Sequence, residues 1–247
     1  MKIADKFNLI LKNINKYNIS KKKISSIFFC TFADCIGLHL IKFWIDKKNF
    51  FPMLKKYLSG IYSSIAMNEY LVVFDKNINN YYDKIIITWG QPSNLSENSY
   101  KDKYLNASNK ENSQILWIVI MGKHDPKIES VANTIFFFEK KISKIKKVYN
   151  FFLYSYLKKF KYNYSLDISF FTQESFFSLH LYEKILPFFN DKLKVVLMPY
   201  ENQPFQSTII KYIKENFKST NIIGYVHSFP SFPSHFLKSE FCPHKLI

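Results

Sequence analysis

Polar side chains follow several apolar runs of this 247-residue chain, at points where the strands of a sheet would end. Glu201 comes after one such run and precedes the amide side chains of Asn202 and Gln203. A carboxylate in that setting predicts a general base or an acceptor for a sugar hydroxyl. The segment equally suits a helix start, where the amides cap free N–H groups and Glu201 complements the helix dipole. Both roles can hold together.

His227 and Ser228 follow another apolar run, in which Gly224 permits close backbone packing. An imidazole in that position can bind a phosphate or a hydroxyl, or titrate near neutral pH. The alternative is an interior histidine bonded to a backbone carbonyl. We favour a functional role because Glu201 ends a neighbouring predicted strand, which predicts that both side chains face one crevice at the rim of the sheet.

Other kinds of site find less support in the sequence. The tail residues His227, His235, Cys242 and His244 match none of the close ligand pairs of zinc sites, so no metal is expected. A serine hydrolase would need a nucleophile elbow, GxSxG, which does not occur. The glycine patterns of dinucleotide sites and P-loops do not occur either, and no cofactor is expected.

Hydrophobic periodicity predicts the elements that would position these residues. Apolar runs predict strands at Ile27–Phe32, Lys84–Trp89, Ile115–Met121, Leu193–Met198 and Ile222–Val226. Helical spacing predicts helices at about 38–60, 129–160, 173–189 and 204–218. Strands of this kind, separated by helices, predict an α/β fold: a Rossmann-like open, mostly parallel sheet with helices on both faces. The Ser- and Asn-rich segment 92–113 predicts a long loop.

Residues 1–23 are polar and rich in lysine, and we expect them to form a lead-in to a single domain that spans residues 24–247. The first residues do not resemble a signal peptide. No run approaches the ~18 uncharged apolar residues that a spanning helix needs. The expected location is therefore the cytoplasm, with peripheral attachment at the inner face of the membrane as an open possibility.

The formal net charge of +16 comes from 35 basic residues, all of which are lysine. Scarce glycine together with abundant Lys, Asn, Ile, Phe and Tyr is typical of an A/T-rich genome. Nucleic acid is not the expected partner, because its recognition relies on the bidentate contacts of arginine. Lysine clusters at 21–23 and 140–147 suit an anionic membrane surface. The three cysteines are too few for a disulfide framework, which indicates a reducing compartment.

Several short motifs resemble a known family. They are MPYENQPFQ at 198–206, IGYVHSFPSFPS at 223–234, CPHKLI at 242–247 and, further upstream, YKDKYLN and QILWIVI within 100–120. The set is similar to bacterial surface-carbohydrate biosynthesis proteins, which are glycosyltransferase-like and have two Rossmann domains, the GT-B type. The resemblance extends over roughly residues 84–247. Phe205 stands where the family favours tryptophan.

The resemblance implies the acceptor-side, N-terminal half of such a transferase, because the chain ends at Ile247, where the family continues into its donor-binding domain. The donor would be a nucleotide sugar, and the acceptor a glycan or a lipid-linked glycan. The motif positions imply Glu201 and His227 as catalytic residues. They imply a substrate-binding role for Asp102, Tyr200, Asn202, Gln203 and Ser228. The alternative is a non-catalytic α/β binding or scaffolding protein, as a truncated relic or a subunit of a split enzyme.

Overall fold

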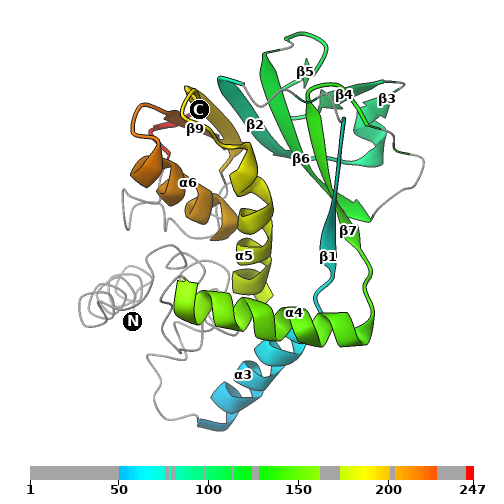
Figure 1. The fold of residues 1–247 in the computed structure, drawn as a ribbon, viewed down its shortest axis with the longest axis vertical. Coiled ribbons are helices and arrows are strands. Elements are labelled where there is room, and N and C mark those ends of the chain that lie inside the picture. The colour runs from blue at the N-terminus through cyan, green and yellow to red at the C-terminus, as the bar shows by residue number, and fades with distance from the viewer. Residues whose placement is uncertain are drawn as a thin grey trace, which may run out of the picture.

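The computed structural model describes most of the chain after residue 49. The described residues are 50–75, 78, 82–96, 98–112, 114–123, 128, 130–161, 173–200, 204–226 and 243–247. The lead-in 1–23 and the predicted strand Ile27–Phe32 therefore lie outside the described residues. In the described part, α-helices pack on a mixed, mostly parallel sheet, which confirms the α/β class (Figure 1).

Among the described residues, the main sheet has seven strands in the order β1-β7-β6-β2-β8-β9-β10. They are β1 (Glu69–Phe74), β2 (Lys84–Trp89), β6 (Ile115–Lys123), β7 (Thr134–Lys140), β8 (Val195–Pro199), β9 (Asn221–Tyr225) and β10 (Lys245–Leu246). All neighbouring pairs run parallel except β1 and β7. Strand β2 has the predicted bounds, and β6, β8 and β9 lie within two residues of their predicted ends.

The predicted helix 129–160 is wrong in its first third, because Thr134–Lys140 forms strand β7. The run TIFFFEK is short and aromatic, and its side chains are divided between two apolar layers. Ile135 and Phe137 belong to one core, and Phe136 and Phe138 belong to the other. A strand between two covered faces can bury all four, which explains why this segment is extended.

The described residues also form four α-helices. They are α3 (Phe50–Ile65), α4 (Lys144–Tyr156), α5 (Gln173–Ile185) and α6 (Pro204–Asn216). A π-helical turn, Leu157–Lys161, continues α4, and a short 3₁₀ turn, Leu186–Phe188, ends α5. Helices α5 and α6 confirm the predictions for 173–189 and 204–218, and α6 begins at its proline, whose fixed φ suits a first helical position.

The polar segment 92–113 is not a long loop. It contains a small three-stranded antiparallel sheet of β3 (Leu95–Ser96), β4 (Ser99–Asp102) and β5 (Ala107–Ser108). Asn98 and Asn106 adopt positive φ angles of 56° and 48° at the two tight turns that reverse the chain. Asparagine tolerates this left-handed conformation, so the Asn-rich composition that predicts a loop here serves two hairpins.

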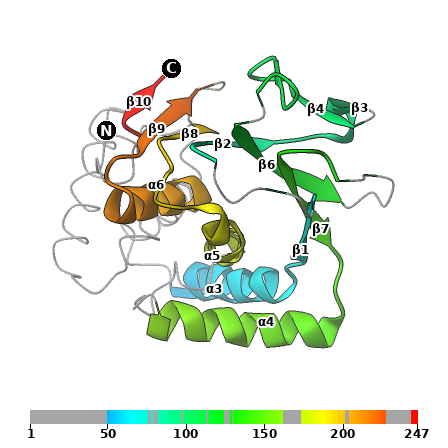
Figure 2. The same cartoon turned by 45° about the horizontal axis from the view of Figure 1, so that its top comes forward.

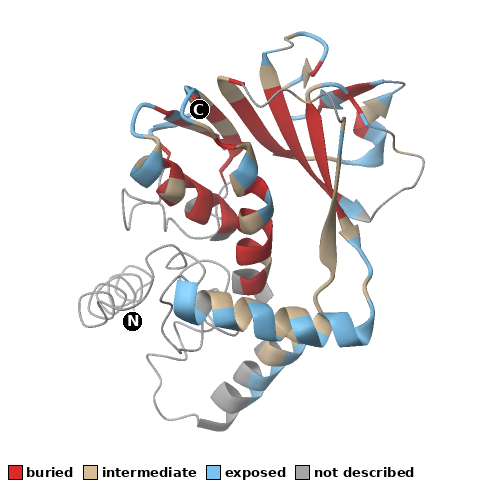
Figure 3. Ribbon diagram, viewed as in Figure 1, coloured by how far each residue is buried: buried red, intermediate tan, exposed pale blue. Residues whose placement is uncertain are grey.

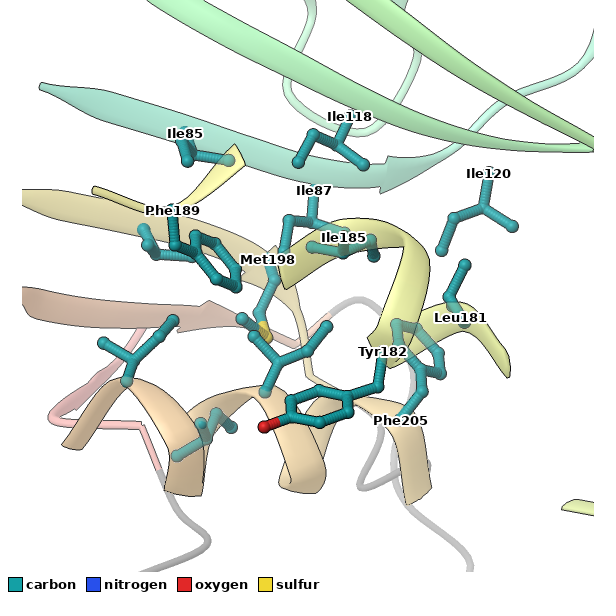
Figure 4. Close-up of a cluster of buried hydrophobic side chains, with 14 of the residues drawn as sticks. Ile85, Ile87, Ile118, Ile120, Leu181, Tyr182, Ile185, Phe189, Met198 and Phe205 are labelled. Carbon is teal, nitrogen blue, oxygen red and sulfur yellow. The ribbon is translucent and has the colours of Figure 1, made fainter. Parts of the chain in front are cut away.

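The two faces of the main sheet are covered differently (Figure 2). On one face, Ile85 and Ile87 of β2 pack with α5 and α6 in the larger core, which includes Leu181 and Phe205 (Figure 4). On the other face, Ile86 of β2 packs with residues of the small sheet. The prediction of helices on both faces is therefore wrong for the described part of the chain. There, the small sheet covers the second face.

Candidate functional site

The candidate site is the carboxyl edge of the parallel strands, where the sequence analysis expects Glu201 and His227. Strands β8 and β9 are hydrogen-bonded neighbours, with Pro199 opposite Tyr225. The N–H of Tyr200 donates to the carbonyl of Tyr225 at 2.9 Å. The two adjacent strands end at the same edge, β8 two residues before Glu201 and β9 two residues before His227.

The predicted residues Glu201, Asn202, Gln203, His227 and Ser228 lie outside the described residues. Their roles and their mutual approach remain predictions. What the structure does establish is that the strands leading to the two segments are adjacent and parallel. That adjacency was itself an expectation from the sequence, and it is confirmed.

The start of α6 fixes one side of the predicted turn. The Nε2 of Gln206 donates to the carbonyl of Pro199 at 2.6 Å, so the first turn of the helix is bonded to the last residue of β8. The ring of Phe205 packs edge-on against Trp89, with centroids 5.5 Å apart. Phe205 is buried and therefore fills the core between β2 and α6.

Tyr200 lies in the larger core rather than on the surface, and its side chain is buried. A Cβ added at Gly224 would approach the Cβ of Tyr200 to 2.8 Å. The glycine therefore allows β9 to pass close to the start of the predicted turn, as the sequence suggests. The substrate-binding role of Tyr200 stays a prediction.

Asp102, at the end of β4, is fully buried at this edge of the second face. Its Oδ2 accepts hydrogen bonds from the hydroxyls of Thr88, at 2.6 Å, and Tyr100, at 3.1 Å. Its Oδ1 accepts from the backbone N–H groups of Tyr104 and Leu105, both at 2.8 Å. Four donors satisfy this carboxylate, which joins the small sheet to the carboxyl end of β2.

Tyr225 extends the network from the end of β9. Its hydroxyl lies 3.3 Å from the Thr88 hydroxyl, and its ring contacts Tyr104, with centroids 6.3 Å apart. Tyr104 is 51% exposed, so an aromatic surface is open to solvent beside the buried carboxylate. Burial and the Asp102 carboxylate raise the pKa of Tyr100, which keeps its hydroxyl protonated as a donor.

Sequence reasoning missed Thr88, Tyr100, Tyr104 and Tyr225. The one local signal was Thr88, a polar residue inside the otherwise apolar run KIIITW. A buried hydroxyl needs a partner, so this threonine could have indicated a polar network at the end of β2. The three tyrosines carry no comparable signal, because the chain has 17 of them.

A second buried polar cluster centres on His180 of α5, which the sequence analysis did not single out. Its Nε2 accepts from the N–H of Tyr70 at 2.9 Å, and its Nδ1 is hydrogen-bonded to the hydroxyl of Tyr154. Burial, and secondarily the charge of Lys184, lowers the pKa of His180 to about 4. The neutral imidazole links β1, α4 and α5.

In the part of the chain that the structure describes, no group of three His, Cys, Asp or Glu side chains is arranged to hold a metal ion. The same residues include no helix long and apolar enough to cross a bilayer. Comparisons of the chain with protein-family models, with curated proteins and with solved structures find no match. The site is therefore interpreted from its own residues.

Proposed function

We propose that the chain is a glycosyltransferase-like protein of surface polysaccharide biosynthesis. It would hold the glycan or lipid-linked acceptor during sugar transfer from a nucleotide-sugar donor, and a second domain of the GT-B type would hold the donor. Glu201 would act as the base or orient the acceptor hydroxyl, and His227 with Ser228 would bind phosphate or hydroxyl groups. Asn202 and Gln203 would supply amide contacts beside Glu201.

The strand order supports a Rossmann-like reading of the sheet. Counted along the chain, the six mutually parallel strands lie across the sheet in the order 3-2-1-4-5-6. This is the order of Rossmann folds, in which ligands bind beyond the carboxyl ends where the order reverses. Here the reversal falls between β2 and β8. The small sheet in the β2–β6 connection is a departure from the usual helix.

The observation that carries the proposal is the pairing of β8 with β9, next to this reversal. These two adjacent strands precede the predicted acidic turn and the predicted imidazole segment in the sequence, which supports the prediction that the two segments lie near each other. The exposed ring of Tyr104 adds a surface of the kind on which sugars and bases stack. The buried carboxylate of Asp102 would act as a positioning residue, because protein groups already donate to both of its oxygens.

The experiment is a transfer assay with nucleotide sugars and glycan acceptors, on the chain alone and with a donor-binding domain added. We expect Glu201→Gln and His227→Ala each to lower transfer by about 100-fold or more, the effect of losing an acid–base group. Glu111→Gln is the matched control, because Glu111 is exposed on the small sheet's flank and a glutamine oxygen can still accept from the Ser108 N–H.

Wild-type transfer in both variants would reject the assigned site. Titration calorimetry separates the alternative function, a non-catalytic α/β binding protein. Acceptor binding that persists in the two variants, without any transfer in the presence of the donor domain, would support that alternative and not the transferase.

A further inference from the structure

The outer face of α4 is apolar and exposed. Five side chains at positions i, i+3, i+4, i+7 and i+11 define this outer face: Ile145, Val148, Tyr149, Phe152 and Tyr156. Their spacing places them on one side of a helix. Ile145 is 84% exposed, Phe152 66% and Tyr156 60%. Figure 3 shows α4 in tan and pale blue along its length.

The inner face of the same helix contacts neighbouring elements, so a rotation of α4 that buried its outer face would break these contacts. Asn150 donates to Glu69 at 2.9 Å, and Lys146 forms an ion pair with the same carboxylate at 2.7 Å. The ring of Phe151 stacks on Phe176 of α5 with centroids 5.2 Å apart. Tyr154 is bonded to His180, as described above. A surface helix normally turns its apolar side inward, and this one has apolar groups on both sides.

The charged residues of α4 and of the segments that flank it are all lysines. Between Lys140 and Lys161 the sequence has eight lysines and no aspartate or glutamate. Lys141, Lys144 and Lys159 are exposed, and none of the ion pairs among the described residues involves them. Two acidic groups near the helix, Glu69 and Glu183, are each already paired with a lysine.

We propose that the outer face of α4 docks on an anionic lipid bilayer. Aromatic and aliphatic side chains on one side of a helix, flanked by lysines, are the pattern of helices that lie in the membrane interface. Phe152 and Tyr156 would enter the boundary between headgroups and acyl chains. The exposed lysines would contact anionic headgroups, each contributing attraction near the surface.

A lipid surface fits this face better than a second copy of the chain. In a symmetric dimer the same patch lies on both sides of the interface. The lysines of α4 would then face the lysines of the other copy, with no acidic residue of α4 to pair with them. Like charges brought together oppose association, whereas a bilayer with anionic lipids supplies the missing opposite charge.

Docking through α4 also has a geometric consequence. The helix begins at Lys144, just after β7 ends at Lys140, so it starts at the carboxyl side of the parallel strands (Figure 1). The candidate site lies on that same side of the sheet. Membrane docking stands independently of the proposed transferase, and a lipid-linked acceptor would be brought toward the site if both hold.

The test is co-sedimentation of the full chain with vesicles of equimolar phosphatidylcholine and phosphatidylglycerol, and with vesicles of phosphatidylcholine alone. The wild type should sediment with the anionic vesicles. The double variant F152S/Y156S should bind at least about tenfold more weakly, because it removes two large apolar groups from the interface. The single variant Phe74→Ser, at an exposed apolar residue on β1, should bind like the wild type.

Matched charge reversals distinguish membrane binding through the outer face of α4 from general attraction between anionic lipid and a chain with net charge +16. The triple variant K141E/K144E/K159E should lose binding. The control K101E/K110E/K218E changes the net charge equally at exposed lysines elsewhere and should retain most of it. Equal loss in the two triples would overturn the proposal, since binding would then follow net charge alone.

A direct readout does not depend on loss of binding. In a Tyr156→Trp variant, vesicles with brominated acyl chains should quench the added fluorescence relative to the wild type measured in parallel. Absence of additional quenching would overturn the proposal. So would a dimer seen by light scattering that becomes monomeric in F152S/Y156S, because the outer face would then be an interface between copies. Circular dichroism and thermal unfolding establish that each variant is folded.

Discussion

His180 is held in its neutral form by the packing around it. Protonation would place a proton on Nε2, the atom that accepts the N–H of Tyr70, and would set two donors against each other. Burial opposes the same charge, and the pKa falls from its ordinary 6.5 to about 4. A group without a role in the proposed chemistry thereby makes the stability of the fold depend on pH.

We predict that the fold loses stability as the pH falls from about 6.5 to about 4. In that interval the unfolded chain binds a proton at this histidine and the folded chain does not, so the contribution is complete above the interval and disappears below it. The expected loss is on the order of 3 kcal/mol. Urea unfolding at several pH values measures it, and His180→Gln should show a shallower slope. An unchanged slope would contradict the assignment.

Asp102 is the other residue on which several elements depend. We predict that Asp102→Asn lowers the free energy of unfolding by about 2–3 kcal/mol. The amide keeps one oxygen for the Tyr104 and Leu105 N–H groups, but its NH₂ cannot accept the hydroxyls of Thr88 and Tyr100. Denaturant unfolding measures the change. The control Asp191→Asn alters an exposed carboxyl and should change little; equal effects would refute the network.

At the scale of elements, β9 depends on a glycine that lets two other segments approach. A Cβ at Gly224 would lie 2.8 Å from both Pro243 Cγ and Tyr200 Cβ. Through this contact the terminal strand β10 pairs with β9, and the N–H of Ile247 donates to the carbonyl of Gly224 at 2.9 Å. The end of the chain is thereby attached to the sheet beside the candidate site.

We predict that Gly224→Ala destabilises the protein by about 1–3 kcal/mol, the range for overpacking a filled interior, and frees β10 for proteolysis. Gly122→Ala in β6 is the matched control, because a Cβ there meets no atom within 4 Å. Thermal unfolding and limited proteolysis of the two variants measure the difference. If the C-terminus of Gly224→Ala resists proteolysis as well as that of the wild type, the contact is dispensable.

At the scale of the molecule, two apolar layers lie on opposite faces of one sheet. The central strands β2, β6 and β7 contribute side chains to both layers in alternation, so each is covered on both sides. The antiparallel β1 borders the sheet at one edge, and the two-residue β10 borders it at the other. A two-residue border strand such as β10 offers little edge for another chain to pair with.

This architecture predicts a gradient of amide hydrogen exchange. Amides of β6 and β2 should exchange slowest, because opening them disrupts both apolar layers at once. Amides of α4 should exchange faster, because none of its residues is buried. Exchange measured by mass spectrometry on the full chain tests this order. Equal protection of α4 and β6 would indicate that α4 is covered in solution, which would also oppose membrane docking.

Elements with a local hydrophobic pattern can be predicted from the sequence alone. Strand β2 and helices α5 and α6 follow from apolar runs and helical spacing, because a strand covered on both faces must be apolar throughout. The adjacency of β8 and β9 followed from the expectation of a parallel sheet. The positions of Glu201 and His227 relative to each other stay predictions.

Features that depend on residues far apart in the sequence could be established only from the folded structure. Thr134–Lys140 forms a strand because β1 and β6 pair with it on either side. The local hydrophobic periodicity of the segment does not indicate these partners. The carboxylate of Asp102 accepts a hydrogen bond from the hydroxyl of Thr88. The same hydroxyl is hydrogen-bonded to that of Tyr225, 137 residues away in the chain. Hydrogen bonds between residues so far apart form only when the fold is complete, and a single sequence therefore does not show which residues are their partners.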